Sequence, residues 1–258
     1  MERAFGVAAG LDPQVATPLA ARCAELGYTS MWSNDHPAAS GLETLAAFAE
    51  GSAAIDLGVG VLALDRHEPE AIAARIDELG LPRERLWIGL GAGFSKRPLT
   101  AMREALPRLR EALDDIRIVL AAMGPRMCAL GGAEYDGVFF NWMTPEFASG
   151  ARENVERGAA EARREAPPVF GYVRTAVGAD AAERLAKEES FYRDLHAGYR
   201  NHFDRLGEPE GTVGVAATDP AAAQAALARY DALDVAVVRG LASAKLEAMG
   251  ALAEAAAP

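Results

Sequence analysis

The stretch Arg85-Leu-Trp-Ile-Gly-Leu-Gly-Ala-Gly93 is an apolar run that ends in alternating glycines. Its apolar residues follow one another with almost no polar residue between them, as in parallel strands that are covered on both faces. Similar short runs recur along the whole chain, and segments of helical period separate them. This alternation predicts an α/β fold that is built on a parallel sheet.

Eight strands are predicted, each followed by a helix. The strands are predicted at 5–11, 30–33, 55–64, 85–90, 116–123, 138–143, 168–177 and 234–239. The helices are predicted at 12–26, 43–50, 68–79, 99–113, 125–135, 145–164, 181–206 and 243–256, with an extra strand at 212–217 and an extra helix at 220–230. Eight such units predict a (β/α)8 (TIM) barrel formed by a single domain over 1–258, and an open doubly wound sheet is the alternative.

Composition limits the partners of the protein. The 258 residues include 26 Lys and Arg and 37 Asp and Glu, which gives a net charge of −11. An acidic chain is a poor partner for nucleic acid or an anionic membrane. No apolar run is long enough to span a membrane, and the N-terminus lacks the pattern of a secretory signal. With Cys23 and Cys128 expected as buried thiols, we expect a cytoplasmic protein that acts on a small-molecule substrate.

Polar residues at the carboxyl ends of strands are the first candidates for an active site in such a barrel. The second predicted strand ends in Asn34, Asp35 and His36. We interpret these three as candidate catalytic residues, with His36 donating a proton or contacting a ligand ring and its neighbours supporting it. The alternative is a loop in which Asn34 and Asp35 bind their own backbone.

Glycines in two neighbouring predicted strands are candidate cofactor contacts. In the fourth strand, Gly89, Gly91 and Gly93 alternate and therefore share one face, where a flat cofactor would find room. In the third strand, Gly58 and Gly60 indicate a bulge or the close approach of a ligand. The alternative in both strands is that the small residues relieve crowding inside the barrel or against a helix.

Two further features are typical of an anion site. Gly124 and Pro125 open the helix after the fifth strand, where backbone N–H groups can bind an anion. Arg174 and Arg239 stand near the ends of the seventh and last strands, where barrels often bind phosphate, although a surface ion pair is the alternative for each.

Four aromatic residues near strand ends either form an apolar substrate pocket or belong to the core: Trp32, Phe94, Phe140 and Trp142.

The sequence lacks the residue patterns that several common kinds of catalysis require. No His-x-His pair ends a strand, so we predict no metal site. The three lysines, Lys96, Lys187 and Lys245, lie outside the predicted strands, which argues against Schiff-base chemistry. Neither a G-x-S-x-G elbow nor a G-x-x-x-x-G-K loop occurs. The sequence therefore favours an enzyme whose reactivity comes from a cofactor.

Six stretches resemble, in order, the bacterial-luciferase-like (LLM class) flavin monooxygenase superfamily, and specifically its branch that depends on coenzyme F420. They lie at 24–28, 31–37, 55–61, 85–93, 121–125 and 134–138. The resemblance implies a luciferase-like (β/α)8 barrel, a homodimer, and a flavin-type ring bound at the carboxyl ends of the strands. We therefore expect coenzyme F420 as the cofactor, with FMN as the alternative.

The resemblance also implies roles for single residues. His36 would lie against the deazaflavin, and a bulge at Gly60-Val61, often with a cis peptide, would lie behind the ring. The cofactor tail would run along Gly124 and Pro125, with the preceding Ala122. Phe94 stands where sugar-phosphate dehydrogenases of this branch carry an acidic residue, which argues against that substrate. The segment 179–218 would be a reduced form of the family's insertion before the last strand, giving a shallower pocket.

The leading hypothesis is an F420-dependent oxidoreductase that moves a hydride between the deazaflavin and a small organic substrate. The first alternative is an FMN-dependent luciferase-like monooxygenase. The second is a flavin- or F420-binding relative without turnover. The third is a non-redox barrel enzyme that binds phosphate at Arg174 and Arg239.

Overall fold

Parallel strands form a closed barrel in the computed structural model, which describes all residues, 1–258. Seven strands pair in sequence order, and a last strand pairs with both β7 and β1, which closes the barrel. They are β1 (Glu2–Val7), β2 (Ser30–Ser33), β3 (Asp56–Ala63), β4 (Leu86–Gly91), β5 (Arg117–Ala121), β6 (Gly137–Asn141), β7 (Val169–Val177) and β9 (Val235–Gly240). The predicted (β/α)8 barrel is confirmed, and the open sheet is excluded.

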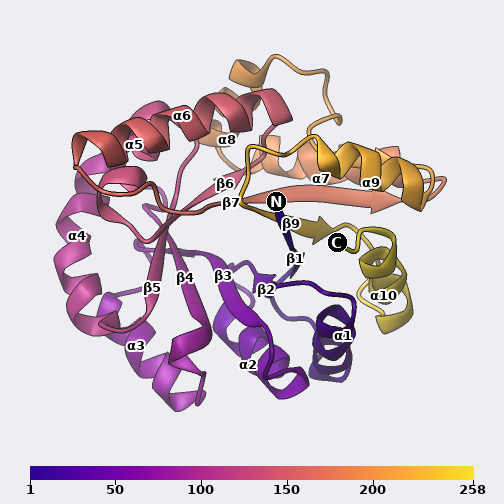
Figure 1. Cartoon of the computed structure of the whole chain (residues 1–258), viewed down its shortest axis with the longest axis horizontal. Helices are drawn as coiled ribbons and strands as arrows, with labels where there is room; N and C mark the ends of the chain where they lie inside the picture. Colours follow the sequence, from indigo (N-terminus) through magenta and orange to yellow (C-terminus); the bar gives the residue numbers. More distant parts are fainter.

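Helices surround these strands (Figure 1). They are α1 (Pro13–Glu25), α2 (Gly41–Gly51), α3 (Pro69–Glu78), α4 (Pro98–Leu113), α5 (Pro125–Glu134), α6 (Pro145–Glu161), α7 (Ala181–Leu195), α8 (Ala197–Leu206), α9 (Pro220–Ala228) and α10 (Leu246–Ala255), with a short 3₁₀ turn at Arg83–Arg85. None of the helices is both long enough and apolar enough to cross a membrane.

Capping residues explain why several helices begin where they do. The side chains of Asp12, Ser40, Thr144 and Asp219 each accept a hydrogen bond from a backbone N–H in the first turn of the helix that follows. Such a cap satisfies one of the N–H groups that a helix N-terminus leaves free. Three of these helices also have proline in their first turn, where its missing N–H costs nothing.

The long helix predicted at 181–206 is wrong in one respect, because the chain breaks it into α7 and α8. His196 stands between them in an extended conformation (φ −159°, ψ 144°), and its ring accepts a hydrogen bond from the N–H of Gly198. Histidine thus caps α8. The extra strand is present as β8 (Val215–Ala217), which pairs with the carboxyl end of β7. The segment between β7 and the last strand therefore contains α7, α8, β8 and α9.

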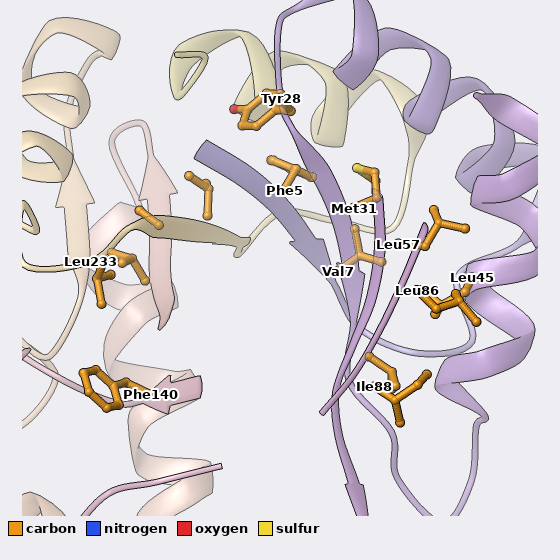
Figure 2. Close-up of a cluster of buried hydrophobic side chains, with 14 of the residues drawn as sticks. Phe5, Val7, Tyr28, Met31, Leu45, Leu57, Leu86, Ile88, Phe140 and Leu233 are labelled. Carbon is orange, nitrogen blue, oxygen red and sulfur yellow. The ribbon is translucent and has the colours of Figure 1, made fainter. Parts of the chain in front are cut away.

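Buried hydrophobic side chains form a layer outside the strands, a smaller one inside the barrel, and a third cluster where Trp142 meets α7 and α8. The outer layer is a cluster of 53 residues between strands and helices, part of which is drawn in Figure 2. The inner cluster has eight residues and includes Trp32, Phe139 and Tyr172. Neighbouring residues of a strand face opposite sides, so Phe139 lies inside the barrel while Phe140 lies in the outer layer. Figure 2 labels Phe140 among the residues of that outer layer.

Candidate functional site

A cavity of about 610 Å³ lies at the carboxyl ends of the strands, within the roughly 300–1,000 Å³ range of small-molecule sites. Residues at or after the ends of β2, β5, β6, β7 and β9 line it, together with the β3 bulge and side chains of α4, α5, α7 and α8. In barrels of this kind the active site lies at this end.

A bulge in β3 forms part of the cavity wall. The pairing of β3 with β4 shifts its register between Val59 and Leu62, and the peptide bond between Gly60 and Val61 is cis. Both of these last residues line the cavity. A Cβ on Gly60 would lie 3.1 Å from the Tyr172 hydroxyl oxygen, so glycine leaves the room that the bulge needs.

The bare channel predicted along β4 does not exist, and this expectation is corrected. The side chain of Val61 covers the strand: its methyl groups lie 2.9 Å and 3.1 Å from where Cβ atoms of Gly89 and Gly91 would be. Gly91 therefore touches Val61, and Val61 faces the cavity in its place. Neither Gly91 nor Gly93 lines the cavity.

The chain turns sharply at Gly93, away from the cavity. Its φ of +57° is a conformation that favours glycine, and a Cβ there would collide with the carboxylate of Asp65. That carboxylate accepts a hydrogen bond from the N–H of Phe94 at 2.9 Å. The Phe94 side chain is 65% exposed and lies against the ring of His196, so its predicted place in the pocket is not observed.

The loop after β2 brings two of its three candidate residues to the cavity. Asn34 accepts a hydrogen bond from the N–H of Ala9 at 2.7 Å, and Asp35 accepts one from the N–H of Gly41 at 3.0 Å. Both line the cavity. His36 is not among the residues that line the cavity, and its Nδ1 accepts a hydrogen bond from the N–H of Ala38.

Asp35 is oriented by partners other than His36. Its Oδ2 lies 2.9 Å from Nε2 of His67 and 2.9 Å from Nη2 of Arg66. These two residues follow β3, which is the neighbour of β2 in the barrel. Sequence reasoning missed this pair, although adjacent strand ends in a parallel sheet would have indicated it.

Four arginines surround the cavity, and none of them forms an ion pair. Arg174 is buried in the second half of β7 and Arg239 near the end of β9, while Arg126 and Arg205 are exposed on α5 and α8. The only carboxylate in the lining, Asp35, is already engaged. The cavity is therefore electropositive in a protein whose net charge is −11.

Arg174 is the most enclosed of these cations, with 2% of its surface exposed. One guanidinium nitrogen donates to Oδ1 of Asn141, while Nε has no partner. The guanidinium lies over the rings of Trp142 and Tyr192, with 4.1 Å and 5.1 Å to the ring centroids. Aromatic faces thus hold the group in place without neutralising it.

Tyr172 forms part of the cavity floor, and sequence reasoning missed it. It is 4% exposed, and its hydroxyl has no hydrogen-bond partner. Burial raises the pKa of this hydroxyl, and the charges of Arg239 and Arg174 oppose the rise. A buried hydroxyl without a partner is uncommon and indicates a position that a ligand can satisfy.

The start of α5 lies along another wall. Gly124 is the N-cap and Pro125 the first helical residue, and both line the cavity with Ala122. A Cβ on Gly124 would meet nothing within 4 Å, so the space in front of it is open. The N–H groups of Met123 and Gly124 have no acceptor within the protein. The start of α5 therefore offers free N–H groups beside open space, an arrangement that can bind an anion.

The predicted aromatic pocket is corrected. The side chains of Trp32 and Trp142 are buried below the cavity lining, the first donating to Ser30 and the second packing under Arg174. Phe140 points to the outer core. The aromatic residues that do line the cavity come from three elements: Phe139 from β6, Tyr172 from β7, and Tyr192 and Tyr199 from α7 and α8.

Comparisons with known proteins agree with this fold. A family model described as luciferase-like monooxygenase matches residues 100–256. An F420-dependent tetrahydromethanopterin reductase from Methanopyrus kandleri superposes with a TM-score of 0.75 at 18% identity, covering 98% of this chain and 96% of that one. For an F420-dependent secondary alcohol dehydrogenase the TM-score is 0.72 at 14% identity, with 99% and 98% covered.

A structure that contains FMN is similar as well. It is the oxygenating constituent of 3,6-diketocamphane monooxygenase from Pseudomonas putida, with a TM-score of 0.68 at 12% identity, covering 100% of this chain and 99% of that one. At sequence identities this low, the superpositions establish a common fold and nothing more.

Proposed function

The chain belongs to the luciferase-like monooxygenase family of flavin- or F420-dependent oxidoreductases, and we propose that it uses F420. It would transfer a hydride between the deazaflavin and a small organic substrate. The observation that carries the proposal is the cavity at the barrel end with four arginines and no free carboxylate.

The donor set of the cavity suits a flat ring with an anionic tail. The ring would lie against the bulge at Gly60 and Val61, where the absence of one side chain keeps the wall flat. The tail would follow Ala122, Gly124 and Pro125, where open space and free N–H groups meet. The orphaned donors on Tyr172 and Arg174 add two further hydrogen-bond positions.

The positive charge of the cavity favours F420 over FMN. F420 carries a phosphodiester and a tail of glutamate carboxylates, whereas FMN carries one phosphate. Arg126, Arg174 and Arg239 offer more positive charge than a single phosphate requires. The two F420-dependent structural neighbours support the same choice.

Bound F420 supplies a two-electron carrier that exchanges a hydride with the substrate. The protein's part is to bind, orient and enclose. The β3 bulge would hold the ring, and the arginines would hold the anionic groups. Tyr192 and Tyr199, from α7 and α8, line the same cavity and would exclude water from the substrate. Asn34 and Asp35 are held rigidly beside the substrate space by the hydrogen bonds described above.

FMN is the second candidate, and the FMN complex among the structural neighbours favours it. The N-terminus of α5 would hold its phosphate without change.

We further propose a cytoplasmic location, which the buried thiols of Cys23 and Cys128 support, and a homodimer, which rests on the family resemblance alone.

Titration with F420, followed by the quenching of its fluorescence, tests the arginine assignment. Arg239→Gln removes a buried cavity charge and should weaken F420 binding at least about tenfold, or 1.4 kcal/mol. Arg103→Gln is the matched control, because Arg103 is exposed on α4 and lies outside the cavity. Equal losses in both variants, or none in either, would contradict the proposed cofactor site.

A further inference from the structure

Three of the five large apolar side chains that the structure leaves exposed lie together beside the cavity. Phe191 and Leu195 are 60% and 51% exposed and, being four residues apart on α7, share one face of that helix. His196 follows them, and its ring centroid lies 4.8 Å from that of Phe94, which is 65% exposed. These four residues form one surface, which we call the rim patch.

Residues of the cavity adjoin the rim patch on two sides. The ring of Phe191 contacts that of Tyr192, with 5.6 Å between the centroids, and Tyr192 lines the cavity. Shortly after Phe94 in the chain, Pro98 and Leu99 line the cavity at the start of α4. The rim patch is therefore continuous with the mouth of the cavity.

The size of the cavity leaves little room for a substrate. Its volume of about 610 Å³ suits one drug-sized ligand. The proposed function, on which this inference rests, gives much of that volume to the deazaflavin ring and its anionic tail. A substrate of more than a few atoms must then extend beyond the mouth, where it meets the exposed apolar side chains.

The rings of the rim patch indicate which kind of group fits there. Phe94 and Phe191 are largely exposed aromatic rings. Aromatic groups pack on such rings in offset or edge-to-face geometry and gain more than the burial of apolar area alone provides. We propose that the substrate has a flat aromatic body that binds to the rim patch, outside the cavity, while its reacting group reaches the cofactor inside.

A second copy of the chain fits the rim patch less well. Stable interfaces take about 20–30 residues from each side and have few charged residues at their centre, whereas only four residues form this patch. The exposed charged residues Lys96, Arg97 and Asp194 are its close neighbours in the chain. The small size of the patch therefore favours a small molecule.

Binding of 6-fluoro-2-naphthol, followed by the fluorine NMR signal of this probe, tests the site. The wild type should bind the probe, and Phe94→Ser and Phe191→Ser should each weaken binding about fivefold or more, with unchanged melting temperatures. Leu246→Ser is the matched control, because Leu246 is also exposed but lies on α10, outside the cavity lining. No binding by the wild type, or equal affinities in all variants, overturns the proposal.

Competition separates an aromatic preference from simple apolarity. Unlabelled 2-naphthol and decahydro-2-naphthol share one carbon skeleton, but only the first is flat and aromatic. The aromatic compound should displace the probe at a several-fold lower concentration, although the saturated one is the more apolar. Equal displacement by the two compounds overturns the aromatic class.

Saturation with F420 distinguishes the rim patch from the cavity. Because the patch lies outside the cavity, bound F420 should leave the probe in place, and displacement of the probe overturns the proposal. If F420 does not bind while probe binding still depends on Phe94 and Phe191, the proposed function fails and the rim patch stands as a binding site. Sedimentation velocity tests the other occupant: if the two variants change the oligomeric state and not the probe affinity, the patch is an interface between copies, which overturns the proposal.

Discussion

The Oδ2 atom of Asp35 lies 2.9 Å from Nε2 of His67, so the carboxylate is paired across two strand ends and not with its neighbour in sequence. The same oxygen also accepts a hydrogen bond from Arg66. The side chain of Asp35 is almost fully buried while its two partners are about one third exposed. The loop after β2 is thereby fixed at the edge of the cavity.

Asp35→Asn should therefore cost stability, whereas His36→Ala should not. The amide keeps an oxygen for the N–H of Gly41 but loses the charge that holds Arg66 and His67. Solvent screening of the exposed partners reduces the effect, and we expect a loss of roughly 1–2 kcal/mol. Denaturant unfolding measures it. His36→Ala should bind F420 as the wild type does, and a large loss of affinity would place His36 back in the site.

Arg174 should show opposite effects on binding and on stability. Arg174→Met removes a buried charge that has no counter-ion, so the unliganded protein should melt at the same temperature or higher, although the stacking on Trp142 is lost. Its affinity for F420 should fall at least about tenfold, because charge-assisted hydrogen bonds contribute roughly 1.5–3 kcal/mol. If Arg174→Met is less stable but binds F420 as tightly as the wild type, Arg174 serves the fold alone.

Two glycines separate packing from ligand space. Gly58→Ala places a Cβ about 2.3 Å from the indole of Trp32 and should destabilise the barrel by roughly 1–3 kcal/mol. Gly124→Ala meets no protein atom, so it should keep the melting temperature but weaken F420 binding. Gly150→Ala, on α6 and equally open, is the control and should leave binding unchanged. Normal binding by Gly124→Ala would argue against a tail at the start of α5.

The barrel could be predicted from the sequence, because each strand is a short apolar run that is separated from the next by a segment of helical period. Strand β2 was predicted at 30–33 and is found there. The break at His196 was not predicted, because no proline marks it and it depends on a side-chain cap. Of the six stretches that carried the family resemblance, two, at 121–125 and 134–138, lie within the matched residues 100–256.

Side-chain direction was the part that sequence could not give. Runs such as Phe139-Phe140 are apolar on both faces, so no alternation shows which residue points inward. The channel over Gly91 was closed by Val61 of a neighbouring strand, which is a tertiary contact. Arg174 and Arg239 do line the cavity. This could be expected, because charged residues toward the carboxyl ends of barrel strands lie at the end that holds the active site.

Acid should loosen α8 through His202. Its imidazole is buried and contacts the backbone oxygen of Trp142, and burial holds its pKa below the ordinary value of 6.5. Below that value the unfolded chain takes up a proton that the folded protein resists, so stability is present above pH 6.5 and is lost as the pH falls. Melting curves between neutral and acidic pH should show a smaller loss in His202→Gln. An equal loss in both proteins would contradict this assignment.

The proposed choice of cofactor is tested most directly by titrating the wild-type protein with F420 and with FMN under the same conditions. The electropositive cavity predicts that F420 binds, and that it binds more tightly than FMN. Raising the salt concentration should weaken F420 more than FMN, since more charges are screened. Tighter binding of FMN, or binding of neither compound, would contradict the account.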